Sequence, residues 1–398
     1  MCPASLPEWG SLLRLKRLDI LRCVAILLVV CAHTQITAFA ARVGWTGVDL
    51  FFVLSGFLIS GLLYSEYKKR QDISFKRFFV RRGLKIYPAF YAMIAATFAA
   101  QHLLWHGAPS PLQNFFYELA FIQNYRFGIW GHTWSLAVEE HFYIGLALLL
   151  LLLVRLSSNR VNPFRSIPAI FAVVAAACLT LRCLTIWVLP PADNLTAHVT
   201  NPTHARIDAL FFGVFIGYLY HFRPEVIQKL LRPWGNRILI GLLSAVLLSV
   251  CYFFARDSHV LLAFGLTTLY LGFGGLLVLG LEVRGIFAGA TAKFLESLGT
   301  AAAYLGRHSY SIYLWHAPFL QVVDVVLRKV IHVPVAPLAV ALIKIVGSCA
   351  LGIVFAHLIE FPVLKFRDRF FPMLQQPAAP AVSPGVGTRV EAPAQEPA

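Results

Sequence analysis

An arginine and a histidine lie eleven residues apart inside a segment that is apolar enough to cross a membrane. Arg22 and His33 both belong to residues 18–39. At about 100° per residue, eleven steps make three helical turns plus about 20°, so both side chains project from one face, about 16 Å apart along the axis. Ionisable side chains are costly in a membrane and mark functional sites there. The spacing therefore predicts a proton-carrying imidazole deep in the membrane, with a cation on the same face.

The composition requires most of the remaining chain to be embedded in lipid as well. Of 398 residues, 58% are hydrophobic and only 13% are charged, which is too few charges to cover a soluble protein of this size. We expect an all-α polytopic bundle of about ten transmembrane helices. The expected spans are 18–39, 46–64, 86–105, 136–154, 167–189, 209–221, 238–255, 260–281, 309–327 and 337–359.

The basic residues indicate how this bundle is oriented. Lysines and arginines crowd the segments before the first span and after the second, and the positive-inside rule assigns such segments to the cytoplasm. Because the number of spans is even, both termini are expected to be cytoplasmic. This topology accounts for the net charge of +15 without a nucleic-acid partner.

Three regions follow from this interpretation. Residues 1–17 are predicted to form a cytoplasmic N-terminal segment, 18–371 a membrane-embedded domain, and 372–398 a disordered tail rich in proline and alanine. The seven cysteines form no C-x-x-C pair, and we interpret them as small apolar residues. Neither a metal site nor a disulfide is expected.

A carboxylate is expected beside His33. A short link joins the first two spans as an antiparallel hairpin, so Asp49 lies at about the depth of the histidine. A carboxylate against an imidazole fixes its tautomer and stabilises the imidazolium, which is the arrangement of a general base. The alternative is a structural hydrogen bond that holds the hairpin together.

A basic cluster enters the third span from the cytoplasmic side. Arg81, Arg82 and Lys85 lie within two helical turns of one another. Guanidinium groups bind phosphate through paired, charge-assisted hydrogen bonds, so the cluster is suited to a phosphorylated cytosolic donor. The alternative is that these residues only set the topology.

A third motif joins a long aromatic loop to the fourth span. Glu139 and Glu140 are costly at a span entrance unless they face protein or water. Ser135 and Glu139 share a helix face because they are four residues apart, and Trp134 precedes them. One interpretation is acceptor binding beside the histidine. The other is that a carboxylate pairs with a buried cation such as Arg182.

Three weaker signals have structural interpretations. Arg206 and Asp208 are predicted to form a local ion pair, and the aromatic stretch 310–318 is predicted to pack within its span. Glu360 closes the last span, where it could pair with Arg22 or with the loop arginines.

Together these segments resemble acyltransferase family 3, a family of integral membrane O-acyltransferases. The resemblance is ordered along the chain and covers Arg17 to about Pro362. It rests on Arg17-Leu-Asp19-Ile-Leu-Arg22 with His33, Gly47-Val-Asp49-Leu-Phe-Phe-Val-Leu-Ser55-Gly56-Phe57, Arg81-Arg82 with Tyr87-Pro88, and Thr133-Trp134-Ser135-Leu-Ala-Val-Glu139-Glu140. Two positions depart from the family pattern, since Lys85 stands where arginine is usual and His141 where glutamine is common.

The resemblance implies transfer of an acyl group from cytosolic acyl-CoA to a hydroxyl, usually of a carbohydrate. In that case His33 would be the general base, without a permanently bound cofactor, and acetyl-CoA is the expected donor substrate. The residues implied for donor binding are Arg22, Arg81 and Arg82, and Lys85 joins them from the basic cluster described above. Glu139 and Glu360 are implied as supporting residues, whereas the residue patterns above add Asp49 as a catalytic residue and Trp134, Ser135 and Glu140 as binding or supporting residues. The expected location is the inner (plasma) membrane of a bacterium.

Two other function classes fit the same residues. Intramembrane histidine, carboxylates and arginine also suit a proton-coupled transporter or flippase of a lipid-linked saccharide. A membrane sensor that binds a ligand without turnover is a third interpretation. The acceptor, the acyl chain, the oligomeric state and the use of a covalent acyl-enzyme, for instance on Ser55, stay open at this point.

Overall fold

A computed structural model describes residues 16–34, 36–103, 110–158, 160–189, 194–282, 289–331 and 336–372, and these residues form helices and connecting segments without a strand. The α-helices are α2 (Lys16–Thr34), α3 (Ala38–Val43), α4 (Gly47–Arg70), α5 (Phe75–Leu103), α6 (Leu112–Leu119), α7 (Trp134–Leu156), α8 (Ile167–Val188), α9 (Leu195–Thr200), α10 (Ile207–Phe222), α11 (Pro224–Leu231), α12 (Trp234–Leu248), α13 (Val250–Phe253), α14 (Leu266–Glu282), α15 (Gly289–Arg307), α16 (Ser309–Val326), α17 (Pro337–Phe355) and α18 (Phe361–Phe370). Short 3-10 turns are η1 (Gly44–Thr46), η2 (Gly131–Thr133) and η3 (Thr203–Ala205), and π-helical turns are η4 (Leu261–Gly265), η5 (Leu327–Ile331) and η6 (Ala356–Glu360). The predicted tail beyond residue 372, and the N-terminal segment before residue 16, lie outside the described residues.

The prediction of an all-helical fold is confirmed for this part of the chain, whereas the number of about ten transmembrane spans and the cytoplasmic termini stay predictions. A helix lies at each of the ten expected spans, and seven of the helices that the structure describes are long and apolar enough to cross a membrane. The other three expected spans correspond to α2, α10 and α16. Charges near its start interrupt the apolar stretch of α2, and α10 is short.

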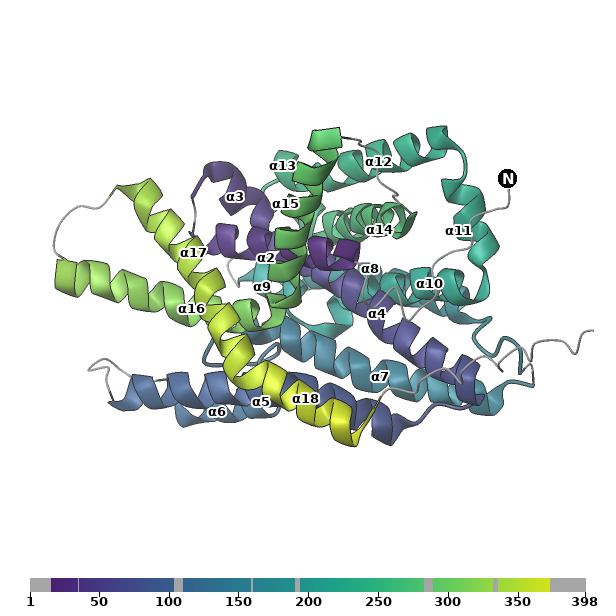
Figure 1. The fold of residues 1–398 in the computed structure, drawn as a ribbon, viewed down its shortest axis with the longest axis horizontal. Helices are drawn as coiled ribbons and strands as arrows, with labels where there is room; N and C mark the ends of the chain where they lie inside the picture. The colour runs from purple at the N-terminus through teal and green to yellow at the C-terminus, as the bar shows by residue number, and fades with distance from the viewer. Residues whose placement is uncertain are drawn as a thin grey trace, which may run out of the picture.

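Helix α4 is the centre of the bundle and runs diagonally through it (Figure 1). Within the span Ala38–Arg70, which contains α4, 78% of the most apolar window is buried, against 11% for α8 and 11% for the span formed by α12 and α13. Gly56 of α4 and Gly213 of α10 allow the two backbones to approach closely, because a Cβ on Gly56 would overlap the carbonyl oxygen of Leu210. The α4–α10 pair therefore forms a rigid support for the side chains around it.

A second close crossing brings α2 against α15. Gly306 lies directly on the backbone of Asp19, where a side chain would not fit. Asp19 in turn accepts a hydrogen bond from Arg22 Nη1 at 2.7 Å. This crossing sets Arg22 beside Arg307, the last residue of α15, so residues almost 300 positions apart share one cavity.

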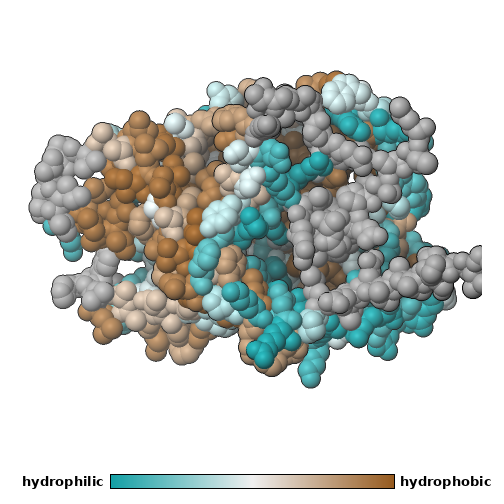
Figure 2. All heavy atoms as spheres, viewed as in Figure 1, coloured by the Kyte–Doolittle hydropathy of each residue, from teal (hydrophilic) through white to brown (hydrophobic). Residues whose placement is uncertain are grey.

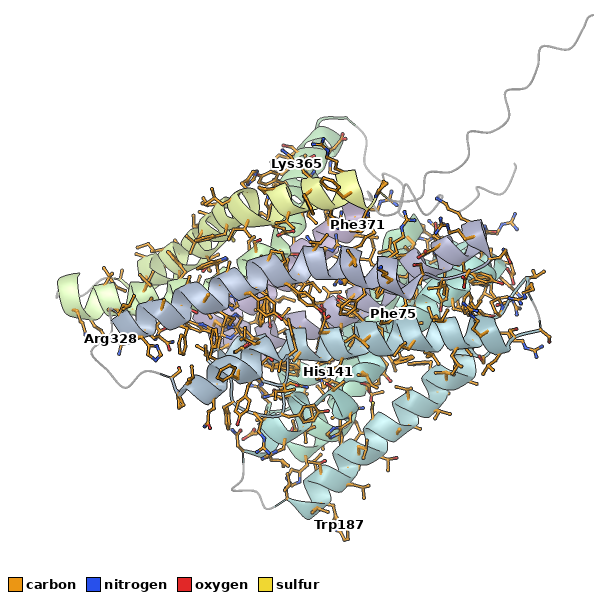
Figure 3. All side chains as sticks on the ribbon, turned by 90° about the horizontal axis from the view of Figure 1, so that it is seen from below. Phe75, His141, Trp187, Arg328, Lys365 and Phe371 are labelled. Carbon is orange, nitrogen blue, oxygen red and sulfur yellow. The ribbon has the colours of Figure 1, made fainter. Side chains whose placement is uncertain are left out.

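The periphery has the surface expected for contact with lipid. Apolar side chains gather over α16 and α17 at the left of the molecule (Figure 2). Helix α17 exposes Leu338, Leu342, Ile343 and Val346. Helix α18 continues from η6 and lies along α5, with Lys365 on it and Phe371 at its C-terminal end (Figure 3).

Two fully buried ion pairs connect α8, α10 and α4. Arg182 Nη1 lies 2.8 Å from Asp208 Oδ2, and Arg206 Nη2 lies 2.8 Å from Asp49 Oδ1. The predicted local pair of Arg206 with Asp208 is therefore wrong, because residues two apart at a helix start point in different directions. The suggestion that Arg182 pairs with a carboxylate of the 139–140 motif is also wrong, because the partner of Arg182 is Asp208.

Candidate functional site

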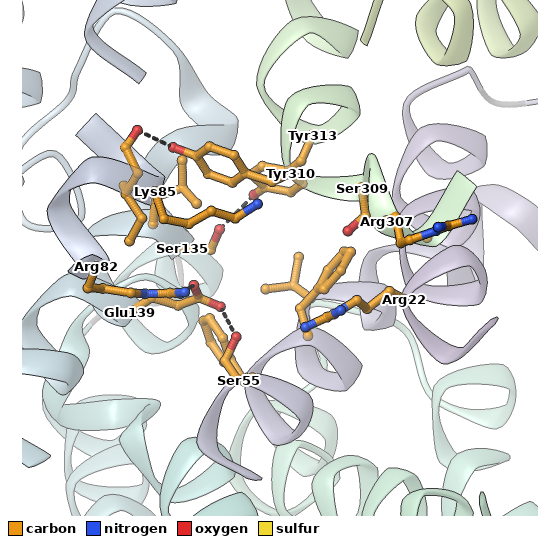
Figure 4. Close-up of a pocket in the computed structure, with 16 residues that line it drawn as sticks. Arg22, Ser55, Arg82, Lys85, Ser135, Glu139, Arg307, Ser309, Tyr310 and Tyr313 are labelled. Atoms are coloured by element: carbon orange, nitrogen blue, oxygen red, sulfur yellow. Dashed lines mark hydrogen bonds and ion pairs between the residues drawn. The ribbon is translucent and has the colours of Figure 1, made fainter. Parts of the chain in front are cut away.

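Two cavities lie next to each other in the middle of the bundle. The first, which we call the cationic cavity, has a volume of about 150 Å³ and is formed by α2, α4, α5, α7, α15 and α16. Four cations line it: Arg22, Arg82, Lys85 and Arg307. Arg82 and Lys85 face Arg22 and Arg307 across the cavity (Figure 4). The structure thus unites three of the four predicted donor-binding residues.

Carboxylates hold three of the four cations of the cationic cavity in place. Glu139 lies 4.0 Å from Arg82 Nη2, and it accepts hydrogen bonds from Ser55 Oγ at 2.8 Å and Tyr143 OH at 2.6 Å. The guanidinium of Arg82 also lies 4.1 Å from the centre of the Tyr143 ring and donates to its hydroxyl at 2.5 Å. Because both oxygens of Glu139 are engaged, this residue orients Arg82 and Ser55.

Lys85 has a carboxylate of its own. Its Nζ donates to Glu360 Oε1, and Ser311 Oγ donates to Glu360 Oε2 at 2.6 Å. Glu360 therefore pairs with Lys85, and both predicted partners, Arg22 and the loop arginines, are wrong. Arg307 differs from the other three cations because no ion pair joins it to a described residue.

Arg81 and Glu140 are among the predicted site residues that do not line the cationic cavity. Arg81 donates to the carbonyl oxygen of Phe371 and lies 3.1 Å from Asp368 of α18. Adjacent residues on a helix are about 100° apart, so Arg81 and Arg82 cannot face the same cavity. Glu140 accepts a hydrogen bond from the hydroxyl of Tyr87, on the side of α7 away from Ser55.

The second cavity, which we call the histidine cavity, has a volume of about 390 Å³. Residues that line it include His33 at the end of α2, His132 of η2, Trp134, Arg206 and Arg256. The predicted residues His33 and Trp134 therefore meet here, whereas Arg22 lies in the cationic cavity further along the same helix. The spacing of Arg22 and His33 corresponds to two cavities rather than one.

The tautomer of His33 is fixed by its own helix. Nδ1 of His33 lies 2.8 Å from the carbonyl oxygen of Val29, and because a carbonyl only accepts, this nitrogen carries the proton. Nε2 is left as the basic nitrogen. The predicted contact with Asp49 is wrong, because that buried carboxylate is bound by Arg206 instead. Matching depth along two helices did not specify which way each side chain points.

Two further imidazoles stand beside His33 and were missed as site residues. The ring of His316 is 5.0 Å from that of His33, and the ring of His132 is 4.8 Å from that of His316. Nδ1 of His316 lies 2.6 Å from the carbonyl oxygen of Tyr313, while its buried Nε2 has no partner among the described residues. His316 could have been found by the argument used for His33, since it is also an ionisable residue within an apolar helix.

The two cavities are separated by the thickness of a side chain. Val48 and Tyr313 line both of them. The Tyr313 hydroxyl donates to the carbonyl oxygen of His132 at 2.6 Å and lies 2.6 Å from Ser135 Oγ. Tyr313 therefore connects the histidine side to the predicted site residue Ser135. A ligand group in one cavity could therefore approach a ligand group in the other beside Val48 and Tyr313.

A buried glutamate holds the loop that delivers His132. Glu118 Oε1 accepts hydrogen bonds from the backbone nitrogens of Ile129 and Trp130 and from Thr133 Oγ1, at 3.0, 3.1 and 2.9 Å. Burial raises the pKa of Glu118 to about 7, although these hydrogen bonds oppose the rise. The described residues contain no group of three His, Cys, Asp or Glu side chains that could hold a metal ion.

Comparisons with known proteins place this chain in a family. A family model described as an acyltransferase domain matches residues 15–357. The chain is 27% identical over 337 residues to the peptidoglycan O-acetyltransferase OatA of Listeria monocytogenes, covering 78% of this chain and 50% of that protein. It is 25% identical over 377 residues to the O-acetyltransferase OatA of Staphylococcus aureus, covering 90% and 59%. The chain thus spans about half the length of the curated relatives it matches, and no solved structure matches it.

Proposed function

This chain belongs to the acyltransferase family, and we propose that it is a membrane O-acyltransferase that moves an acyl group from acyl-CoA to a hydroxyl of a carbohydrate. The observation that carries the proposal is the pair of cavities that meet at Val48 and Tyr313. One is lined by cations, as a phosphorylated donor requires, and the other contains a histidine with a free basic nitrogen. The names of the relatives favour an acetyl group and a cell-wall polysaccharide such as peptidoglycan.

The donor, with acetyl-CoA as the expected one, would enter the cationic cavity. A volume of about 150 Å³ suits a slender acyl-thioester arm rather than a nucleotide, so the phosphates would stay near the basic segment that contains Arg81. Arg22, Arg82 and Arg307 line the cavity and would draw the negatively charged donor toward it by electrostatic attraction. Lys85 is neutralised by Glu360, so it would mainly shape the cavity and offer one hydrogen-bond donor to the ligand.

The acceptor hydroxyl would bind in the histidine cavity, next to His33. Nε2 takes the hydroxyl proton while the oxygen attacks the thioester carbonyl carbon at the wall between the cavities. The new C–O bond forms, the C–S bond breaks, and the leaving thiolate of CoA takes up the proton from the His33 imidazolium, which restores the base. General-base assistance of this kind is worth about 10²–10⁴-fold in rate. The Val29 carbonyl, rather than Asp49, would keep the imidazole in the reactive tautomer.

The remaining predicted residues would act by positioning. Asp49 would fix Arg206 in the wall of the histidine cavity, and Glu139 would orient Arg82 and Ser55. Glu139 accepts a hydrogen bond from Ser55 Oγ and is paired with Arg82, so it would orient Ser55 rather than deprotonate it. Direct transfer to the acceptor therefore accounts for the arrangement without a covalent acyl-enzyme.

The proposal includes the membrane topology. All ten helical spans would cross the plasma membrane of a bacterium, with both termini and the basic segment 68–85 in the cytoplasm. The cationic cavity would then open toward cytosolic acyl-CoA, and the histidine cavity would open toward the outer face. Membrane lipid and a carbohydrate or glycolipid would be the partners, without nucleic acid.

Acyl transfer in isolated membranes tests the proposal. Membranes that contain the wild-type chain are supplied with radiolabelled acetyl-CoA, and label on glycan or lipid-linked saccharide is compared with His33→Ala at matched expression. We expect a loss of about 10²–10⁴-fold. His198→Ala is the control, because His198 is exposed on α9 and lies outside both cavities. Equal label from wild type and His33→Ala would refute the general-base role, and saccharide movement without label would favour a transporter.

A further inference from the structure

The histidine cavity has an unbalanced charge. Two arginines and two histidines line it, and none of its lining residues is a carboxylate. The cationic cavity, by contrast, contains Glu139 among its lining residues. A cavity of about 390 Å³ falls within the usual size of a small-ligand site, roughly 300–1,000 Å³. The positive charge of the cavity therefore indicates which charge its ligand carries.

Arg206 is only partly satisfied by the protein. Its Nη2 donates to Asp49, but its buried Nε has no hydrogen-bond partner among the described residues. The guanidinium is held 5.7 Å from the centre of the Trp134 ring and 5.5 Å from that of Phe52. The side chain is thus rigidly placed, and a donor is left over.

Arg256 has even fewer polar partners. It lies between α13 and η4, and no hydrogen bond or ion pair joins it to a residue that the structure describes; its guanidinium lies 5.3 Å from the centre of the Trp45 ring. Desolvation and the nearby charge of Arg206 lower the pKa of Arg256, and Asp49 opposes this only in part. Two neighbouring cations repel each other, so an anion that reaches both would be stabilised by each.

Aromatic rings complete the surface. Trp45, Trp134 and Tyr313 line the same cavity as the two arginines. Flat aromatic faces suit the apolar faces of sugar rings, whereas arginines suit an oxyanion. The combination fits a sugar that carries a negative charge better than a neutral sugar or an apolar ligand.

We propose that the acceptor is an acidic carbohydrate whose carboxylate or phosphate is bound by Arg256 and by Nε of Arg206, while a hydroxyl of the same molecule faces His33. This inference rests on the proposed function and names its substrate class. A neutral sugar would bind less well, because it brings no charge for Arg256 and Arg206 to pair with.

Binding without turnover tests this inference independently of acyl transfer. The full chain is placed in nanodiscs of a zwitterionic lipid, so that no anionic headgroup competes. Saturation-transfer NMR then measures the binding of glucuronic acid, glucose 6-phosphate and glucose to wild type, Arg256→Gln and Arg126→Gln. Arg126 is the matched control, because it is an exposed loop arginine that does not line the cavity.

We expect at least one acidic sugar to bind wild type and Arg126→Gln about tenfold more tightly than it binds Arg256→Gln, with glucose equal for all three. Preference for glucuronic acid would identify a carboxylate as the recognised group, and preference for glucose 6-phosphate a phosphate. Equal binding of acidic and neutral sugars, or no effect of Arg256→Gln, would overturn the inference. The acyltransferase proposal would survive that result if label still reached a neutral glycan in isolated membranes.

Discussion

The two cavities differ in how far the protein itself has neutralised them. In the cationic cavity, three of the four cations have a carboxylate partner: Arg22 on α2, Arg82 on α7 and Lys85 at the end of η6, whereas Arg307 has none among the described residues. In the histidine cavity, Arg206 alone has one among the described residues, and Arg256 has none. Cations in ion pairs are held in position before a ligand binds. An arginine without an ion pair still has its charge and its hydrogen-bond donors available for an anionic ligand.

The difference suggests a division of labour. Because many reactions use the same donor, it can be recognised by cations that ion pairs already hold in position. Little reorganisation of the side chains is then needed when the donor binds. An acceptor that must be distinguished from similar sugars is better recognised by groups that gain their partner only from the correct ligand. The predictions below test whether each cavity depends on its partners in the stated way.

Asp49→Ala should have the largest effect on stability. It leaves Arg206 as an unpaired buried charge, and breaking a buried pair in this way costs about 3–5 kcal/mol. Thermal unfolding in detergent would record the loss. Asp257→Ala, which removes an exposed carboxylate, should change stability by less than about 0.5 kcal/mol. If Asp49→Ala instead abolished transfer while unfolding stayed unchanged, Asp49 would be acting on His33 after all.

Ser55→Ala should have a moderate effect on activity. Removal of the hydroxyl deletes one hydrogen bond to Glu139, so the positioning of Arg82 should weaken and kcat should fall by about tenfold or less. Initial rates of acyl transfer would measure this. A loss as large as that of His33→Ala would indicate a covalent acyl-enzyme on Ser55 and would contradict direct transfer.

Glu118 should affect stability in a way that depends on pH. Its pKa in the folded state is about 7, above the ordinary value of 4.5. Between these values the unfolded chain has lost the proton that the folded chain keeps, so stability should fall as pH rises through this window and level off above it. Unfolding midpoints from pH 4 to 8 would show the slope. Glu118→Gln should remove the part of the slope that Glu118 causes, and an unchanged slope would assign it to other groups.

Much of the bundle could be predicted from the sequence because the constraint is simple. Apolar segments of sufficient length must become helices in a membrane, and a helix lies at each of the ten expected positions. Spacing along one helix was also informative, as Ser135 and Glu139 show, since both line the cationic cavity. Such patterns depend only on helical geometry.

Contacts between helices could not be predicted in the same way. Asp49 matched His33 in depth, but the direction of each side chain depends on how α4 packs against α2 and α10, and Arg206 became its partner. Glu360 likewise paired with Lys85 because η6 brings it against α5. His316 and Arg256 were overlooked because one lay in an aromatic stretch and the other in a loop. Only the folded structure brings both to His33.

Separate binding measurements on the two cavities test the division of labour most directly. Equilibrium binding of acetyl-CoA and of glucuronic acid is measured for wild type, Arg307→Gln and Arg256→Gln, each in nanodiscs of zwitterionic lipid. Arg307 and Arg256 are the arginines in the two cavities without a described ion-pair partner, so the variants are matched. We expect Arg307→Gln to weaken acetyl-CoA binding by about tenfold and leave glucuronic acid unaffected, and Arg256→Gln to do the reverse. If both variants weakened the same ligand, or if neither discriminated, the two cavities would not serve donor and acceptor separately.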